Sequence, residues 1–119
     1  MSRLMSVAFT EQAVRDRRKT VTRRKGWTFL KPGDRLTLVR KAMGRKPGEP
    51  LVRICDVEVV SVRREPLYMI GGDELEREGC AHLGPVEFWQ RYFSPQGIDW
   101  RDDVTRIEWR YLDAAESAR

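Results

Sequence analysis

The stretch Arg17-Arg18-Lys19-Thr20-Val21-Thr22-Arg23-Arg24 is the most informative part of this sequence, and it places five cations around two threonines. Its β-branched residues favour an extended backbone, in which alternate side chains point to the same face. We therefore expect Thr20, Thr22 and Arg24 to share one side of a strand. Hydroxyls beside guanidinium groups suit a ligand that is anionic and forms hydrogen bonds.

The basic stretch belongs to an asymmetric distribution of charge. The net charge is +5, but residues 1–46 hold 14 Lys or Arg against 3 Asp or Glu, a net +11. Residues 47–119 hold 9 against 15, a net −6. This split favours one positive face with nucleic acid or a nucleotide as its partner. A solvated surface of mixed sign is the alternative.

Length and composition predict one domain. The 119 residues contain no apolar run near the ~20 residues of a membrane span. The first six residues lack the pattern of a secretion signal. We therefore expect a cytoplasmic monomer with no membrane partner.

The two cysteines, Cys55 and Cys80, predict neither a disulfide nor a metal site. Disulfides are uncommon in proteins without a secretory signal. Together with His82, the cysteines lack the paired spacing of zinc ligands. We expect no metal and no other cofactor.

The first half of the chain predicts strands joined by turns. Residues 6–10 are expected to form an opening strand, and a helix capped by Thr10 follows to about Arg17. Lys31-Pro32-Gly33-Asp34 is a turn signal before a strand at residues 35–41. A glycine- and proline-rich connection at 42–50 carries Arg45 and Lys46 at its tip. The longest strand, 51–64, changes register near residues 59–60, which predicts a bulge.

The second half predicts two short helices and a closing strand. One helix covers residues 73–78 and is stopped by Gly79. The other covers 85–93, and its aromatic stripe is expected in the core. Apolar residues then alternate with charged ones at 107–111, as in a strand with one buried face. Residues 113–119 lack an apolar pattern and are expected to be frayed.

These elements give five or six strands with two or three short helices. The fold class is mixed α/β but mainly β, and a small, partly open β-barrel with peripheral helices fits it best.

The basic-threonine stretch also resembles the signature of the ASCH domains, relatives of the PUA RNA-binding fold. The turn at 31–34, Val57-Glu58-Val59 and the closing Arg106-Ile107-Glu108-Trp109 follow in the order that this family shows. The resemblance covers about residues 5–112. It implies a PUA-like pseudo-β-barrel whose basic cleft binds RNA or a modified nucleoside.

The resemblance further implies candidate catalytic residues. Some small bacterial ASCH proteins hydrolyse 4-acetylcytidine with a lysine, a threonine and a glutamate, and other members are described as ribonucleases. The matching residues here are Lys19, Thr22 and Glu78, with Glu74 or Glu76 as alternatives for the carboxylate. The candidate ligand-binding residues are Arg18, Thr20, Arg23, Arg24, Trp27, Arg45 and Lys46.

Two departures from the small amidohydrolases affect these candidates. Arg23 stands where an apolar residue is usual, and the 42–50 connection is longer. Trp27 also has two interpretations, because its ring could stack on a base at the cleft rim or plug one end of the barrel.

The chemistry of Lys19 has two interpretations as well. A lysine acts as a base only when it is neutral, and its ordinary pKa is about 10.4. Burial and nearby arginines would lower that pKa, whereas Glu78 would raise it. Alternatively, a charged Lys19 would hold an oxyanion or phosphate while Glu78 transfers protons. In the simplest interpretation, Glu78 is an ordinary solvent-facing helix residue.

Overall fold

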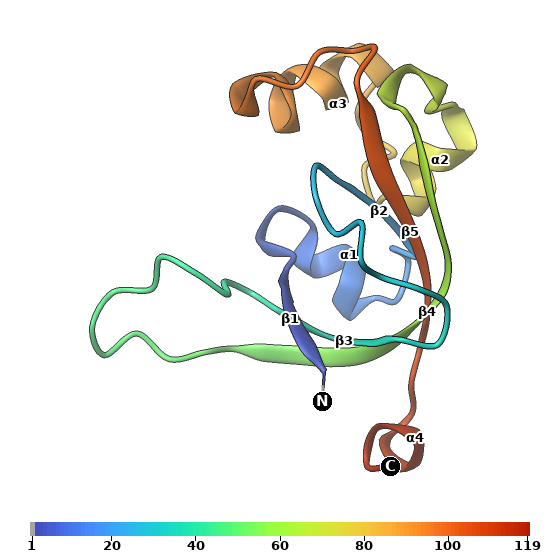
Figure 1. The fold of residues 1–119 in the computed structure, drawn as a ribbon. Coiled ribbons are helices and arrows are strands. Elements are labelled where there is room, and N and C mark those ends of the chain that lie inside the picture. The colour runs from blue at the N-terminus through green and yellow to red at the C-terminus, as the bar shows by residue number, and fades with distance from the viewer. Residues whose placement is uncertain (1) are drawn as a thin grey trace.

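One curved five-stranded sheet organises the computed structural model, which describes residues 2–119 (Figure 1). Its strands are β1 (Arg3–Ser6), β2 (Val21–Arg24), β3 (Arg35–Val39), β4 (Arg53–Pro66) and β5 (Asp103–Tyr111). The strand order is β1-β3-β4-β5-β2, so β1 and β2 form the two edges. The β1–β3 pair is parallel and the other pairs are antiparallel. The sheet is thus an open half-barrel, which confirms the expected fold class.

Short helices surround the sheet. They are α1 (Glu11–Arg15), α2 (Gly72–Arg77), α3 (Pro85–Tyr92) and α4 (Ala114–Ser117), with 3-10 turns η1 (Ala8–Thr10), η2 (Leu67–Met69) and η3 (Ser94–Gln96). In Figure 1, α1 lies inside the curve of the sheet, α2 and α3 lie at one end, and α4 lies at the other. Among residues 2–119 there is no helix with both the length and the apolar character that crossing a bilayer requires.

The expected bulge in the longest strand is confirmed. The pairing between β4 and β5 shifts register between Val59 and Ser61, because Val59 faces Trp109 whereas Ser61 faces Glu108. The extra residue, Val60, is exposed. A bulge of this kind bends the strand and increases its twist. The bend allows β4 to pair with β3 near its start and with β5 up to its end.

The apolar side chains form two clusters. The sheet cluster packs α1 against the sheet and contains Met5, Val7, Val14, Leu30, Leu36, Leu38, Val57, Val59, Ile107 and Trp109. The helix cluster lies around α2 and α3 and contains Leu67, Ile70, Leu75, Cys80, Leu83, Phe88, Phe93, Ile98 and Val104. The aromatic stripe of α3 therefore packs in the core, as expected.

The predicted strand at residues 6–10 is wrong. The strand is β1, which ends at Ser6, and residues 8–10 form the 3-10 turn η1. The N–H of Val7 still donates to Val39 O at 2.9 Å, but the N–H of Thr10 then donates back to Val7 O at 3.0 Å. This turn overrides the strand propensity of the local sequence and leads directly into α1.

Residues 113–119, where we expected a frayed end, contain α4. The carboxylate of Asp113 accepts a hydrogen bond from the N–H of Glu116 at 2.7 Å, which caps the helix. Arg35 donates to Glu116 O at 2.8 Å, and Arg110 pairs with the Glu116 carboxylate at 2.8 Å. These polar contacts hold the segment against the sheet. Because they do not require apolar residues at helical spacing, the sequence of the segment did not predict a helix.

We predict that Gly79→Ala destabilises the fold more than Gly97→Ala. Both glycines have a positive φ, of 80° and 77°, which costs an alanine about 1–2 kcal/mol. A Cβ at Gly79 would also lie 2.7 Å from Ala13 Cβ, whereas nothing lies within 4 Å at Gly97. The additional overpacking costs about 1–3 kcal/mol. Urea denaturation of both variants would measure the difference, and equal losses would contradict it.

Candidate functional site

Lys19 lies in the connection between α1 and β2, where several hydrogen bonds fix its backbone. Its N–H donates to Ala13 O at 3.2 Å. Its carbonyl oxygen accepts from Trp109 Nε1 at 3.1 Å and from the Tyr111 hydroxyl. Trp109 and Tyr111 belong to the alternating residues of β5 that predicted a buried face. Their side chains therefore also fix the backbone of Lys19. The Lys19 residue itself is only 3% exposed.

Glu78 is the carboxylate that meets Lys19. Lys19 Nζ donates to Glu78 O at 2.7 Å and lies 3.2 Å from Glu78 Oε1. Glu78 is only 2% exposed, so its interpretation as a solvent-facing residue is wrong. Gly79, with its positive φ, ends α2 directly after Glu78 and turns the chain away. Glu76 is exposed, whereas Glu74 lies behind Glu78 in the network described below.

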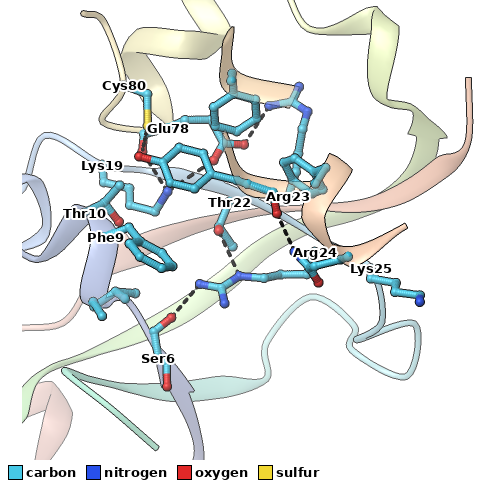
Figure 2. Close-up of a pocket in the computed structure, with 16 residues that line it drawn as sticks. Ser6, Phe9, Thr10, Lys19, Thr22, Arg23, Arg24, Lys25, Glu78 and Cys80 are labelled. Atoms are coloured by element: carbon cyan, nitrogen blue, oxygen red, sulfur yellow. Dashed lines mark hydrogen bonds and ion pairs between the residues drawn. The ribbon is translucent and has the colours of Figure 1, made fainter. Parts of the chain in front are cut away.

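A pocket of about 210 Å³ opens beside this pair (Figure 2). Lys19, Thr22, Arg24 and Glu78 supply polar groups to its wall. The rings of Phe9, Phe88, Tyr92 and Phe93 supply apolar surface. The pocket also touches Val7 and Cys80, so it lies where the sheet cluster and the helix cluster meet.

Arg24 holds Thr22 in place. Its Nε donates to Thr22 Oγ1 at 3.1 Å, and its Nη2 donates to Ser6 O at 2.7 Å. Both of these partners are neutral, and within residues 2–119 Arg24 makes no ion pair with a carboxylate. The guanidinium charge is therefore available to a ligand, and the hydroxyl of Thr22 faces the pocket with its oxygen already accepting one hydrogen bond.

Arg23 joins the pocket carboxylate to a larger ion network. Its Nη1 donates to Glu78 Oε2 at 2.9 Å, and its Nη2 donates to Glu74 Oε1 at 2.6 Å. Glu65 lies 3.4 Å from Nη2, and Arg106 binds the Glu74 carboxylate at 2.6 and 3.2 Å. Arg23 thus contacts both Glu78 and Glu74 and links the pocket to the buried ion pairs behind it.

Burial and ion pairing shift the pKa values of two residues in this network, Lys19 and Glu74. Burial lowers the pKa of Lys19, while Glu78 opposes that shift and Arg24 adds to it. Arg106 and Arg23 lower the pKa of Glu74 from 4.5 to about 2 through hydrogen bonds and charge. Lys19 is therefore easier to deprotonate than an ordinary lysine, and Glu74 stays ionised.

The other predicted ligand-binding residues lie outside the pocket. Arg18 is exposed and pairs with Asp16 at 3.2 Å. Thr20 directly precedes β2, where its N–H donates to Arg77 O and its carbonyl accepts from the N–H of Trp109, and it does not line the pocket. Arg45 and Lys46 are exposed in the connection between β3 and β4.

Trp27 packs against the sheet cluster, with its ring centroid 5.5 Å from that of Phe29. It does not line the pocket. Trp27 therefore contributes to the packing of the sheet cluster, and its role in ligand binding stays a prediction.

Phe9, Tyr92 and Ser6 line the pocket but were not among the predicted site residues. The sequence placed Phe9 in a strand and Tyr92 in the core. No sequence pattern near Phe9 or Tyr92 marks either of them as a pocket residue, because the pocket depends on the packing of η1 beside α3. No group of three or more potential metal ligands gathers among residues 2–119, and both cysteines are free.

Comparison by sequence finds no matching protein-family model and no matching curated protein. Comparison by structure finds a likeness to protein EF3133 from Enterococcus faecalis V583, described with the family model DUF984. The TM-score is 0.71 at 13% identity, over 95% of this chain and 81% of that chain.

A mutant of ZmASCH from Zymomonas mobilis is also similar. The TM-score is 0.55 at 12% identity, over 95% of this chain and 76% of that chain. Likeness at such identities concerns the fold, and it confirms the ASCH-type fold that the basic-threonine stretch predicted.

We predict that Glu74→Gln lowers stability at neutral pH and flattens its dependence on acid. A carboxylate whose pKa falls from 4.5 to about 2 on folding contributes stability above pH 4.5. That contribution, at most about 3 kcal/mol, is lost as the pH falls toward 2. Urea denaturation between pH 2 and 7 would measure it. The matched control is Glu76→Gln, on the exposed side of the same helix. Parallel pH profiles for wild type and Glu74→Gln would contradict the prediction.

Proposed function

We propose that this ASCH-type domain binds one modified pyrimidine nucleoside, free or flipped out of an RNA, in the pocket beside Lys19. The observation that carries the proposal is the meeting of Lys19, Thr22 and Glu78, from separate elements, in one cavity of about 210 Å³. The same three residues are those that the ASCH resemblance singles out.

The size of the pocket favours a single nucleoside over a length of strand. Its volume of about 210 Å³ lies below the roughly 300 Å³ at which pockets for drug-sized ligands begin. A base with its substituent fits this space, and a base within RNA would reach it by leaving the stack.

The distribution of charge favours a ligand with an exposed oxygen. Lys19 and Arg23 are both paired with carboxylates, whereas Arg24 is not. The free charge of Arg24 suits the carbonyl of a pyrimidine, the carbonyl of an acyl substituent or a phosphate.

A second candidate function is hydrolysis of an acyl group on the exocyclic nitrogen of cytidine. The observation that favours it is the lowered pKa of Lys19 in the same pocket as the Thr22 hydroxyl. A buried lysine with a lowered pKa can serve as a general base. In this assignment Glu78 and its own carbonyl orient the lysine amine.

The proposed reaction proceeds through an acyl-threonine. Thr22 Oγ adds to the acyl carbonyl carbon while its proton passes to neutral Lys19, and Arg24 donates to the resulting oxyanion. The carbon–nitrogen bond then breaks, and the leaving nitrogen takes the proton from Lys19. Water hydrolyses the ester, which releases the carboxylic acid and restores the Thr22 hydroxyl.

We predict that calorimetric titration with cytidine and 4-acetylcytidine detects binding to the wild-type protein. Arg24→Gln should weaken it, because that change removes an unpaired cation from the pocket wall. The matched control is Arg18→Gln, since Arg18 lies outside the pocket and should leave the affinity unchanged.

The dependence of affinity on salt would separate a nucleoside from a strand. A neutral nucleoside releases few counterions, whereas RNA binding weakens steeply with salt. The proposal would be wrong if neither nucleosides nor a single-stranded RNA containing 4-acetylcytidine bound.

We predict that the protein releases cytidine from 4-acetylcytidine and that Thr22→Val lowers the rate at least about 100-fold, since the nucleophile is lost. Lys19→Met should lose a factor of about 10²–10⁴, as expected for a general base. Chromatography of the products would measure both rates.

The matched control is Thr20→Val, which removes a hydroxyl two residues away and outside the pocket. Turnover retained by Thr22→Val would exclude Thr22 as the nucleophile. Binding without turnover by the wild type would remove the hydrolase assignment and leave the binding function.

A further inference from the structure

Phe9 is, within residues 2–119, the aromatic side chain that both lines the pocket and lies almost wholly in solvent. It is 84% exposed, whereas Phe88 and Phe93 in the same wall are buried. Other large apolar side chains are exposed as well, but Phe29, Met43 and Met69 do not line this pocket. Its position on η1, directly before α1, holds the ring at the pocket mouth.

A series of ring contacts supports Phe9 from behind. The Phe9 and Tyr92 centroids lie 5.5 Å apart with the planes tilted by 42°. Phe88 contacts both Tyr92 and Phe93, with centroids 5.4 Å apart in each case. The exposed ring is thus braced against the helix cluster, while the rest of its surface has no protein partner.

Hydrogen-bonding groups lie close to Phe9 in the pocket wall. In Figure 2, the Arg24 guanidinium lies between Thr22 and Ser6, and the Phe9 ring lies beside it. The Arg24 guanidinium is planar and is fixed by its bonds to Thr22 and Ser6. A flat ligand in this pocket meets an aromatic ring and polar groups together, a combination that proteins use to bind unstacked bases.

We infer that Phe9, backed by Tyr92, is the stacking platform of the pocket and selects ligands with a planar heteroaromatic ring. This inference rests on the proposed nucleoside-binding function and adds the residue that determines ligand class. Ligand binding covers the exposed face of Phe9, so the ring recovers in the complex the contact that it lacks in the free protein. Aliphatic amides, which have no face to stack, bind poorly.

The test compares variants of Phe9 that differ in shape and aromaticity. Phe9→Ala, Phe9→Leu and Phe9→Trp would each be titrated with cytidine and 4-acetylcytidine by calorimetry. Because the ring is 84% exposed, all three variants should keep the wild-type urea midpoint. The matched control is Phe29→Leu, an exposed phenylalanine outside the pocket whose ring lies against Arg3.

We predict that Phe9→Ala weakens binding about 5- to 160-fold, the range for loss of one stacked aromatic ring. Phe9→Leu should lose nearly as much although it stays apolar, whereas Phe9→Trp and Phe29→Leu should bind as the wild type does. Reduced absorbance of the bound base near its maximum would report stacking directly, and it should vanish in Phe9→Leu.

Two results would overturn the inference, and they are distinguishable. Wild-type affinity in Phe9→Leu, with nucleoside binding intact in the wild type, would remove the stacking role alone. Absence of nucleoside binding by the wild type itself would remove the proposed function and the stacking role with it.

Discussion

The buried contact between Lys19, Glu78 and Arg23 is the interaction on which the site depends. Lys19 and Arg23 come from the segment that leads into and through β2, and Glu78 follows α2. The three residues are each at most 3% exposed, and both carboxylate oxygens of Glu78 meet a cation. This contact joins the edge of the sheet to the end of α2 in the wall of the pocket.

Removing one member of such a network is destabilising, because its partners are left as unpaired buried charges, but the network as a whole adds little stability over an apolar core. Desolvation of buried ions commonly offsets their attraction, and apolar replacements are often neutral or stabilising. In this network the buried cations Lys19, Arg23 and Arg106 pair with Glu78, Glu74 and Glu65. Arg63, Arg77 and Glu108 extend it toward the surface. The value of the network lies in holding Glu78 at one geometry beside Lys19. Arg24 stays outside this network and supplies charge to the pocket.

Patterns within short segments predicted much of the fold. The basic-threonine strand, the bulge in β4, the glycine stop after α2 and the aromatic face of α3 are all properties of neighbouring residues. The ASCH resemblance also singled out Lys19, Thr22 and Glu78, which the structure brings together, although their roles stay predictions.

The remaining features depend on contacts between distant residues. Arg23 reaches Glu74 and Glu78 across 51 and 55 positions, and no local pattern announces such a pair. Phe9 had strand propensity, but the hydrogen bond from Thr10 to Val7 placed it in a turn. The helix α4 depends on Arg35 and Arg110, which lie in two different strands.

The length of β4 has a consequence for how the domain holds together. Val57 and Val59 of this 14-residue strand belong to the sheet cluster, and Leu67, directly after it, belongs to the helix cluster. Strand β5 repeats the arrangement, with Ile107 and Trp109 in one cluster and Val104 in the other. Neither half can therefore open alone without breaking the ladder between β4 and β5, so backbone amides on both sides of the junction should exchange with solvent as one cooperative unit.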